Sequence, residues 1–246
     1  MKLLVCISKT PDTTAKISFI NDNTTFNTEG VQYIMNPYDE WYALVKALEI
    51  KEKAGGTVTL IHVGPKNNET IIRKGLAIGA DDAIRIDKDP VDSLDVATQI
   101  ANAVQDENYD IIFTGKETIE FNNSEVGSML SELLQLPFVS YATKMDVQDN
   151  LARLTRDAGG HEEQVEVTLP ILVSASKGLA EQRIPNMRGI MMAKSKALKV
   201  VEPVSVESRS EIIAFETPEL RSSCTLVDPE NMDELVRLLH EEAKVI

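Results

Sequence analysis

The chain has 246 residues, of which 43% are hydrophobic and 26% charged, a composition typical of a folded globular protein. Its net charge of -14 and aromatic content of 5% argue against nucleic acid and anionic membranes as partners, because the charge repels phosphate and few rings can stack on bases. The two cysteines, Cys6 and Cys224, lie far apart and the three histidines are dispersed, so we expect neither a disulfide framework nor a metal site.

The chain begins with a short apolar run, residues 3–7, that predicts a buried strand. This run is too short for a signal sequence or a membrane span, so we expect a soluble protein that is cytoplasmic in a bacterium. Helical spacing of apolar residues then predicts a helix over 37–54, with Asn36 as its N-cap and Pro37 as its first residue.

The alternation of short apolar runs and helical patterns continues along the chain. Strands are predicted over 57–63, 83–86, 110–114 and 171–175, and helices over 68–80, 93–105 and 124–136. Single helices between strands require crossover connections. The sequence therefore predicts an α/β fold with a mostly parallel, doubly wound, Rossmann-like sheet and helices on both faces.

Two segments depart from this alternation. Residues 145–154 alternate around a polar turn at 148–150 and predict a β-hairpin, followed by a turn at 158–160 and a strand over 164–168. Prolines interrupt the chain after residue 200, and a short amphipathic helix is predicted over 230–243. We therefore expect a nucleotide-binding α/β domain over 1–200 and a C-terminal arm over 201–246 that wraps a partner.

Ligands of parallel α/β sheets bind at the carboxyl ends of the strands, so the loops after residues 7, 63 and 114 are the candidate sites. Residues 114–127 have the layout of a phosphate site, because a strand leads through a glycine and a polar loop into a helix. Neither the Walker A spacing nor GxGxxG is present. We find no catalytic arrangement of side chains, so nothing marks the chain as a stand-alone enzyme.

Residues 173–196 resemble the signature V-x-A-x(6)-[PQ]-R-x(6)-I-M-x-A-[KR]-x-K of the beta subunit of electron-transfer flavoprotein. Matching positions are Val173, Ala175, Arg183, Ile190, Met191, Ala193, Lys194 and Lys196. Residues 36–39, 73–81 and 157–160 also resemble motifs of this family, and the likeness runs over nearly the whole chain.

The resemblance implies an electron carrier, not an enzyme: the beta subunit of a heterodimer whose alpha subunit holds most of the FAD contacts. In this role the chain would bind AMP, help to enclose FAD, and pass electrons from acyl-CoA dehydrogenases, as in fatty acid beta-oxidation, to a quinone-linked acceptor. The residues implied for the nucleotide site are Cys6, Asn36, Pro37, Tyr38, Asp39, Val63, Gly115, Lys116, Glu117, Thr118, Ile119, Glu120, Phe121, Asn122, Asn123, Ser124, Glu125 and Val126. Within a docking loop over 176–196, those implied for contact with redox partners are Met187, Arg188, Ile190, Met191, Lys194 and Lys196.

The chain departs from the family pattern in the loop after residue 114. Glu117 and Glu125 stand where the family has glutamine, and Glu120 and Asn122 stand where it has aspartate. A carboxylate such as Glu125 would repel a phosphate placed beside it. These departures leave open an electron-bifurcating flavoprotein subunit with a second FAD in the beta site. An alternative of another class is a stand-alone adenine-nucleotide hydrolase or sensor with the same sheet.

Overall fold

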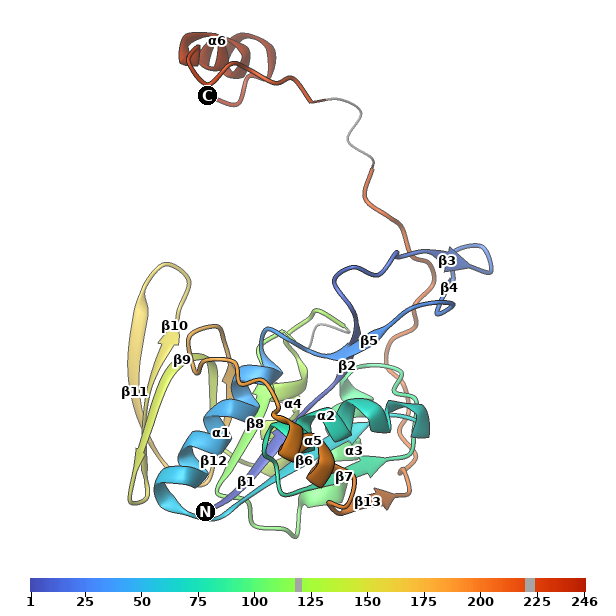
Figure 1. Ribbon diagram of the computed structural model, residues 1–246, viewed down its shortest axis with the longest axis vertical. Helices are drawn as coiled ribbons and strands as arrows, with labels where there is room; N and C mark the ends of the chain where they lie inside the picture. The colour runs from blue at the N-terminus through green and yellow to red at the C-terminus, as the bar shows by residue number, and fades with distance from the viewer. Residues whose placement is uncertain (118–120, 220–223) are drawn as a thin grey trace. The chain divides into compact units, whose positions relative to one another are not determined.

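The computed structural model describes residues 1–117, 121–219 and 224–246. Thr118, Ile119 and Glu120 of the predicted nucleotide site lie outside the described residues. The chain forms two compact units, one of Met1–Ile17 with Thr28–Ile212 and one of Ser18–Asn27 with Ile213–Ile246 (Figure 1). The prediction that residues 201–246 form an arm for another subunit stays a prediction.

The first unit is built on a nine-stranded sheet with the order β11-β10-β9-β12-β8-β1-β6-β7-β13. The strands are β1 (Lys2–Cys6), β6 (Thr57–Val63), β7 (Asp82–Ile86), β8 (Ile111–Gly115), β9 (Phe138–Gln148), β10 (Leu151–Asp157), β11 (Glu162–Thr168), β12 (Ile171–Ala175) and β13 (Leu198–Val201). From β9 to β13 along this order, neighbouring strands are parallel. Strand β10 pairs in antiparallel fashion with both β9 and β11. The strand order reverses at β1, because β6 and β7 continue on one side and β8 lies on the other.

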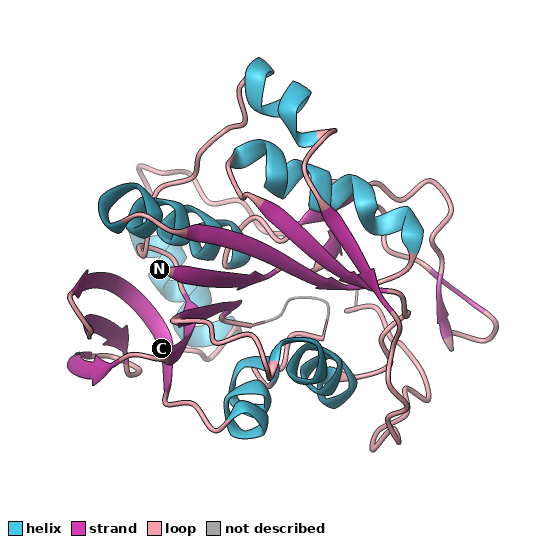
Figure 2. Ribbon diagram, turned by 90° about the horizontal axis from the view of Figure 1, so that it is seen from below, coloured by secondary structure: helices cyan, strands magenta, loops and turns pink. Residues whose placement is uncertain are grey.

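Helices cover both faces of this sheet (Figure 2), which confirms the predicted doubly wound α/β fold. On one face, α1 (Glu40–Ala54) and α2 (Glu69–Ile78) pack against the sheet, and α5 (Met187–Ala193) lies against α2. The other face carries α3 (Ser93–Val104) and α4 (Val126–Leu134). Successive residues of a strand point to opposite faces, so Leu3 and Val5 join the first core and Leu4 joins the second.

Two helices of the first unit begin two or more residues later than the sequence predicts. The α1 helix begins at Glu40, so the prediction of Asn36 as N-cap and Pro37 as first helical residue is wrong. The Asn36 Oδ1 atom instead accepts the N–H groups of Tyr38 at 3.1 Å and Asp39 at 3.4 Å, which closes a turn ahead of the helix. The α4 helix begins at Val126, because Ser124 has a positive φ of 60° that no right-handed helix accommodates.

The predicted β-hairpin is confirmed as β9 and β10, which pair in antiparallel fashion around Asp149. The sequence did not predict that β9 begins at Phe138, where it pairs in parallel with β12. It also did not predict β13, the edge strand beside β7, nor the small ribbon of β2 (Lys9–Pro11) and β5 (Tyr33–Met35). Most residues of these segments are only partly buried, so their apolar pattern is weak.

The second unit combines a short hairpin with the C-terminal part of the chain. The hairpin strands are β3 (Phe19–Ile20) and β4 (Thr25–Phe26). Phe215 stacks on Phe19 with ring centroids 4.8 Å apart, and its N–H donates to the Asn23 carbonyl at 2.8 Å. The predicted C-terminal helix is confirmed as α6 (Met232–Arg237) followed by the π-helix η2 (Leu238–Glu242). No helix among the described residues combines the length and apolarity needed to cross a bilayer.

Candidate functional site

A cavity of about 200 Å³ lies at the carboxyl ends of β1, β6 and β8. Residues 6–9 contribute the end of β1 and the loop after it, His62 and Val63 end β6, and Thr114 and Gly115 end β8. This is the place where the strand order reverses, so the loops that leave β1 and β8 diverge to opposite faces and leave a crevice. The cavity therefore occupies the position that doubly wound sheets use for ligands.

Apolar side chains make up much of the cavity wall. They come from the ends of β1 and β6, the loop before α3, α3 itself, the loop before α4 and the first residue of α4: Cys6, Ile7, Val63, Pro90, Val96, Ile100, Phe121 and Val126. Polar groups among the lining residues are fewer, namely Ser8, Lys9, Glu40, His62, Asn68, Asp89 and Thr114. An apolar slot with a few polar groups suits a flat ring carrying a polar substituent.

Glu40 fixes the loop that follows β1. Its side chain is buried at the first turn of α1, where Oε2 accepts the Ser8 N–H and Oε1 accepts the Ser8 hydroxyl at 2.6 Å. Burial, reinforced by the Glu40 carboxylate, raises the pKa of the Cys6 thiol. Cys6 therefore stays protonated and serves as a small apolar wall instead of a nucleophile.

His62 joins the ends of β1 and β6 beneath the cavity. Its Nδ1 atom lies 2.8 Å from the Ile7 carbonyl and its Nε2 atom lies 2.9 Å from Asn68 Nδ2. This pairing requires a neutral ring that donates through Nδ1 and accepts the Asn68 amide through Nε2. Burial lowers the pKa of His62 to about 4, so the ring brings no positive charge to the cavity at neutral pH.

Two glycines allow helices to approach the end of β8 closely. A Cβ atom on Gly115 would lie 3.0 Å from Glu40 Cγ, and one on Gly127 would lie 2.9 Å from Thr114 Oγ1. The first turns of α1 and α4 therefore come up to the same strand end. Thr114 Oγ1 is buried and has no hydrogen-bond partner among the residues that the structure describes.

Of the described residues predicted for the nucleotide site, five line the cavity: Cys6, Val63, Gly115, Phe121 and Val126. The segment 36–39 lies beside the cavity, since a Cβ on Gly115 would be 3.2 Å from Asp39 Cβ. No residue of this segment lines the cavity. Asn36 is buried and Tyr38 is exposed. The assignment of all these residues to a nucleotide site stays a prediction.

The predicted loop after β8 is tied to its own neighbours. The Asp39 carboxylate accepts the Glu117 N–H at 3.0 Å, and burial is the main cause that raises the pKa of Asp39. Lys116 forms an ion pair with Glu117 at 2.5 Å. Asn123 Nδ2 donates to the Ser93 hydroxyl and to the Glu125 carboxylate, both at 2.7 Å. None of the described residues from Asn122 to Glu125 lines the cavity.

The predicted site residues left out several residues that line the cavity. Glu40 and His62 carried a usable signal, because Glu40 is a charged residue near the start of the helix predicted over 37–54 and His62 is the second-to-last residue of the strand predicted over 57–63. Asp89, Val96 and Ile100 carried no such signal. Val96 and Ile100 reach the cavity through the packing of α3 against the sheet, and Asp89 lies in the loop before α3, so a local pattern does not reveal these residues.

The predicted docking residues cluster on and around α5, where apolar side chains face solvent. Met187 is 74% exposed, Met191 is 70% exposed, and Ile184 and Ile190 are also exposed. The helix lies tightly on α2, because a Cβ on Gly189 would sit 2.3 Å from the Ala77 carbonyl oxygen. The exposed apolar surface of α5 is thus held on a rigid support.

The basic residues of this segment divide into two groups. Arg188 and Lys194 are exposed. Lys196 instead points inward, where its Nζ donates to the carbonyls of Leu76, at 2.9 Å, and Ala80 at the end of α2. Its positive charge therefore complements the C-terminal end of the α2 dipole.

The arrangement of the sheet defines a doubly wound α/β protein with a ligand-sized cavity where the strand order reverses. A family model described as "Electron transfer flavoprotein domain" matches residues 23–206. The chain is 35% identical to the electron transfer flavoprotein subunit beta of Bacillus subtilis (strain 168), with all of both chains covered. It is 33% identical to that of Syntrophomonas wolfei, with 94% of this chain and 91% of the relative covered. The chain belongs to the electron transfer flavoprotein family, as a beta subunit, which confirms the resemblance seen in its motifs.

Proposed function

We propose that this chain binds AMP in the cavity at the ends of β1, β6 and β8, and that it encloses FAD together with an alpha subunit. The proposal rests above all on the position of the cavity at the reversal of strand order. Relatives named electron transfer flavoprotein subunit beta over the full length of the chain support it.

The residues around the cavity fit an adenine nucleotide. Val63, Val96 and Phe121 offer apolar surface to a purine ring. The first residue of the nine-residue helix α4, Val126, lines the cavity, so the positive end of a helix dipole is available to a phosphate. Lys9 supplies a cation among the lining residues, whereas Glu40 and Asp89 would direct a phosphate away from themselves.

A bound FAD would supply the electron-accepting and electron-donating chemistry, and this chain would supply binding and docking surfaces. We propose that the exposed apolar surface around Met187 and Met191 contacts acyl-CoA dehydrogenases or other donors, and that electrons leave toward a quinone-linked acceptor. Flexible, polarisable methionines suit contact with several partners. The second unit exposes apolar side chains at Ile213, Leu226 and Val236, which an alpha subunit would cover.

A second FAD in the cavity, as in an electron-bifurcating protein, is favoured by one observation. The Glu117 N–H, at the start of the loop predicted to bind phosphate, already donates to the Asp39 carboxylate. A mononucleotide phosphate beside this loop would meet the negative charge of Asp39 in place of a donor. A dinucleotide that places its phosphates elsewhere would avoid that contact.

Mass spectrometry of small molecules released from the denatured complex with its alpha subunit would test the proposal, together with a flavin absorbance spectrum. One AMP and one FAD per heterodimer are expected. Two FAD molecules and no AMP would support the alternative, and a complex without flavin would contradict both.

A cavity-filling variant sharpens this test. Val96→Phe places a larger ring in the cavity wall and should lower AMP retention at least about tenfold, because overpacking excludes a ligand from a fixed site. Asn102→Phe, at an exposed position of the same helix, is the matched control and should leave AMP retention unchanged. Equal retention in the two variants would place the nucleotide elsewhere.

A further inference from the structure

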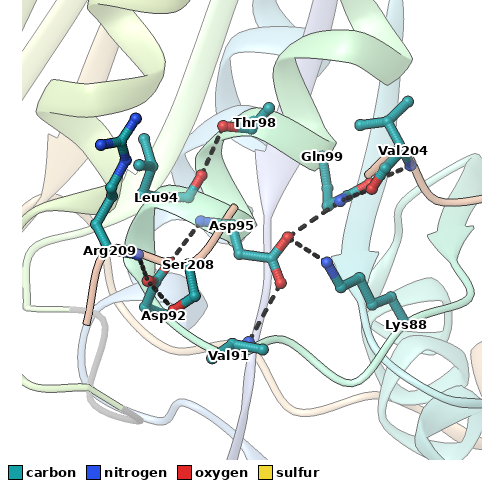
Figure 3. A network of polar contacts seen from close by, with 10 residues as sticks. All are labelled: Lys88, Val91, Asp92, Leu94, Asp95, Thr98, Gln99, Val204, Ser208 and Arg209. Carbon is teal, nitrogen blue, oxygen red and sulfur yellow. Dashed lines mark hydrogen bonds and ion pairs between the residues drawn. The ribbon is translucent and has the colours of Figure 1, made fainter. Parts of the chain in front are cut away.

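The start of α3 and the loop before it contact the cavity on one side and the segment 204–210 on the other. Asp89 and Pro90 line the cavity, and the next two residues, Val91 and Asp92, face the segment 204–210 that follows β13. Within α3, Val96 and Ile100 line the cavity, whereas Asp95 and Gln99 belong to a polar network on the side of that segment (Figure 3). One short stretch of chain therefore forms a wall of the cavity and an attachment point for the segment.

Asp92 is the first attachment point. Its Oδ1 atom caps α3 by accepting the Asp95 N–H at 2.8 Å. Its Oδ2 atom accepts the hydroxyls of Ser208 at 3.1 Å and Ser210 at 3.2 Å, and the Arg209 N–H at 3.4 Å. The same carboxylate thus fixes the helix start and holds residues 208–210.

Gln99 is the second attachment point. Its Nε2 donates to the Val204 carbonyl at 2.7 Å and its Oε1 accepts the Val204 N–H at 2.9 Å, so the amide pairs with both backbone groups of one residue. Nε2 also donates to Asp95 Oδ1 at 3.0 Å, and Asp95 Oδ2 accepts the Val91 N–H at 3.2 Å. The network is therefore continuous from Val204 to the loop beside the cavity.

The attached segment is suited to opening. Residues 202–212 have no helix or strand, and most of their side chains are exposed. The segment is attached by polar contacts to the start of α3, not by a buried apolar face. Its detachment should therefore cost less free energy than opening of the sheet. The chain continues from Ile212 directly into the second unit.

We propose that filling of the cavity and attachment of residues 204–210 are energetically coupled through residues 89–99. This inference rests on the proposed nucleotide function for the identity of the ligand. A ligand against Pro90 and Val96 restricts the loop and helix whose other side carries Asp92 and Gln99. By thermodynamic reciprocity, loss of the attachment weakens ligand binding by the same factor as the ligand strengthens the attachment.

Hydrogen exchange of the full chain, measured with and without AMP, tests the coupling. AMP should slow exchange in residues 202–212 about fivefold or more. The double variant Ser208→Ala with Ser210→Ala removes two donors to Asp92 from exposed positions, so the fold is retained. It should speed exchange in 202–212 and weaken AMP binding, measured by calorimetry, by a matching factor. Ser205→Ala, at another exposed serine of the segment, should change neither quantity.

The outcomes separate this inference from the proposed function. The coupling is contradicted, and the nucleotide function stands, if the wild-type chain and the double variant bind AMP with equal affinity although hydrogen exchange in residues 202–212 is faster in the variant. If neither AMP nor FAD binds, the nucleotide function is contradicted and exchange in residues 89–92 decides the coupling. Faster hydrogen exchange in residues 89–92 of the double variant supports the coupling, and unchanged exchange in these residues overturns it.

Discussion

The cavity at the strand ends and the surface of α5 differ in which side chains are buried and which are exposed. Around the cavity, polar side chains such as Glu40 and His62 are buried and hydrogen-bonded. On α5, the apolar side chains of Met187 and Met191 face solvent. Buried, paired polar groups fix the shape of a small-molecule site, whereas exposed methionines adapt to the surface of another protein. Substitutions in the two regions should therefore have different consequences.

The largest expected effect is the removal of the imidazole under the cavity. His62→Leu leaves the Ile7 carbonyl and the Asn68 amide buried without their partner, so the free energy of unfolding should fall by about 3–5 kcal/mol. Urea denaturation measures this change. His161→Leu, at an exposed turn, is the control and should change stability by less than about 0.5 kcal/mol. Similar losses in both variants would contradict a structural role for His62.

Acid should act on the same group. The pKa of His62 is lowered from 6.5 to about 4 in the folded chain, so between these values the unfolded chain binds more protons. Stability from the neutral ring is therefore complete above pH 6.5 and is lost as the pH falls toward 4, by on the order of 3 kcal/mol. Urea denaturation at pH 7 and pH 4.5 should show a smaller difference for His62→Gln than for the wild type. An equal difference would assign the acid sensitivity to other groups.

A smaller effect is expected where the docking segment is anchored. Lys196→Met removes the donor to the carbonyls at the end of α2 and should lower stability by about 1–2 kcal/mol. Lys194→Met, two residues earlier but exposed, should change stability by less than about 0.5 kcal/mol. Thermal or urea unfolding of the pair would show whether basic residues in one motif have separate roles.

The smallest expected effect on stability is at the exposed tip of α5. Met187→Ser should change the free energy of unfolding by less than about 0.5 kcal/mol, because the side chain is 74% exposed. If this surface docks redox partners, electron transfer from an acyl-CoA dehydrogenase should still slow about tenfold, since a central apolar contact is lost. Met35→Ser, in the core, is the contrasting control and should destabilise the fold. Normal transfer rates for Met187→Ser would remove α5 from the docking surface.

Local patterns predicted much of the sheet. The strands over 57–63 and 171–175 appear with the predicted bounds, and β1, β7 and β8 differ from prediction by a residue at one or both ends. Buried parallel strands are continuous apolar runs, so the sequence alone identifies them. Helix starts were less predictable, because Asn36 caps a turn instead of α1.

The candidate site was only partly accessible to sequence reasoning. The rule that ligands bind at strand ends selected the loops after β1, β6 and β8, all of which contribute to the cavity. It did not select Asp89 or Ile100, which come from the α3 side of the sheet. Motif likeness likewise grouped Lys194 with Lys196, although the structure turns Lys196 toward α2.

The sequence by itself determined the succession of strands and helices, the parallel class of the sheet and the family of the chain, because these depend on local periodicity and short motifs. The tertiary structure alone decided which strand ends meet, which polar groups are buried and paired, and how residues 204–210 attach to α3. Those features depend on contacts between residues far apart in the sequence, 32 positions for Ser8 and Glu40 and 105 for Gln99 and Val204, and no local pattern encodes such pairings.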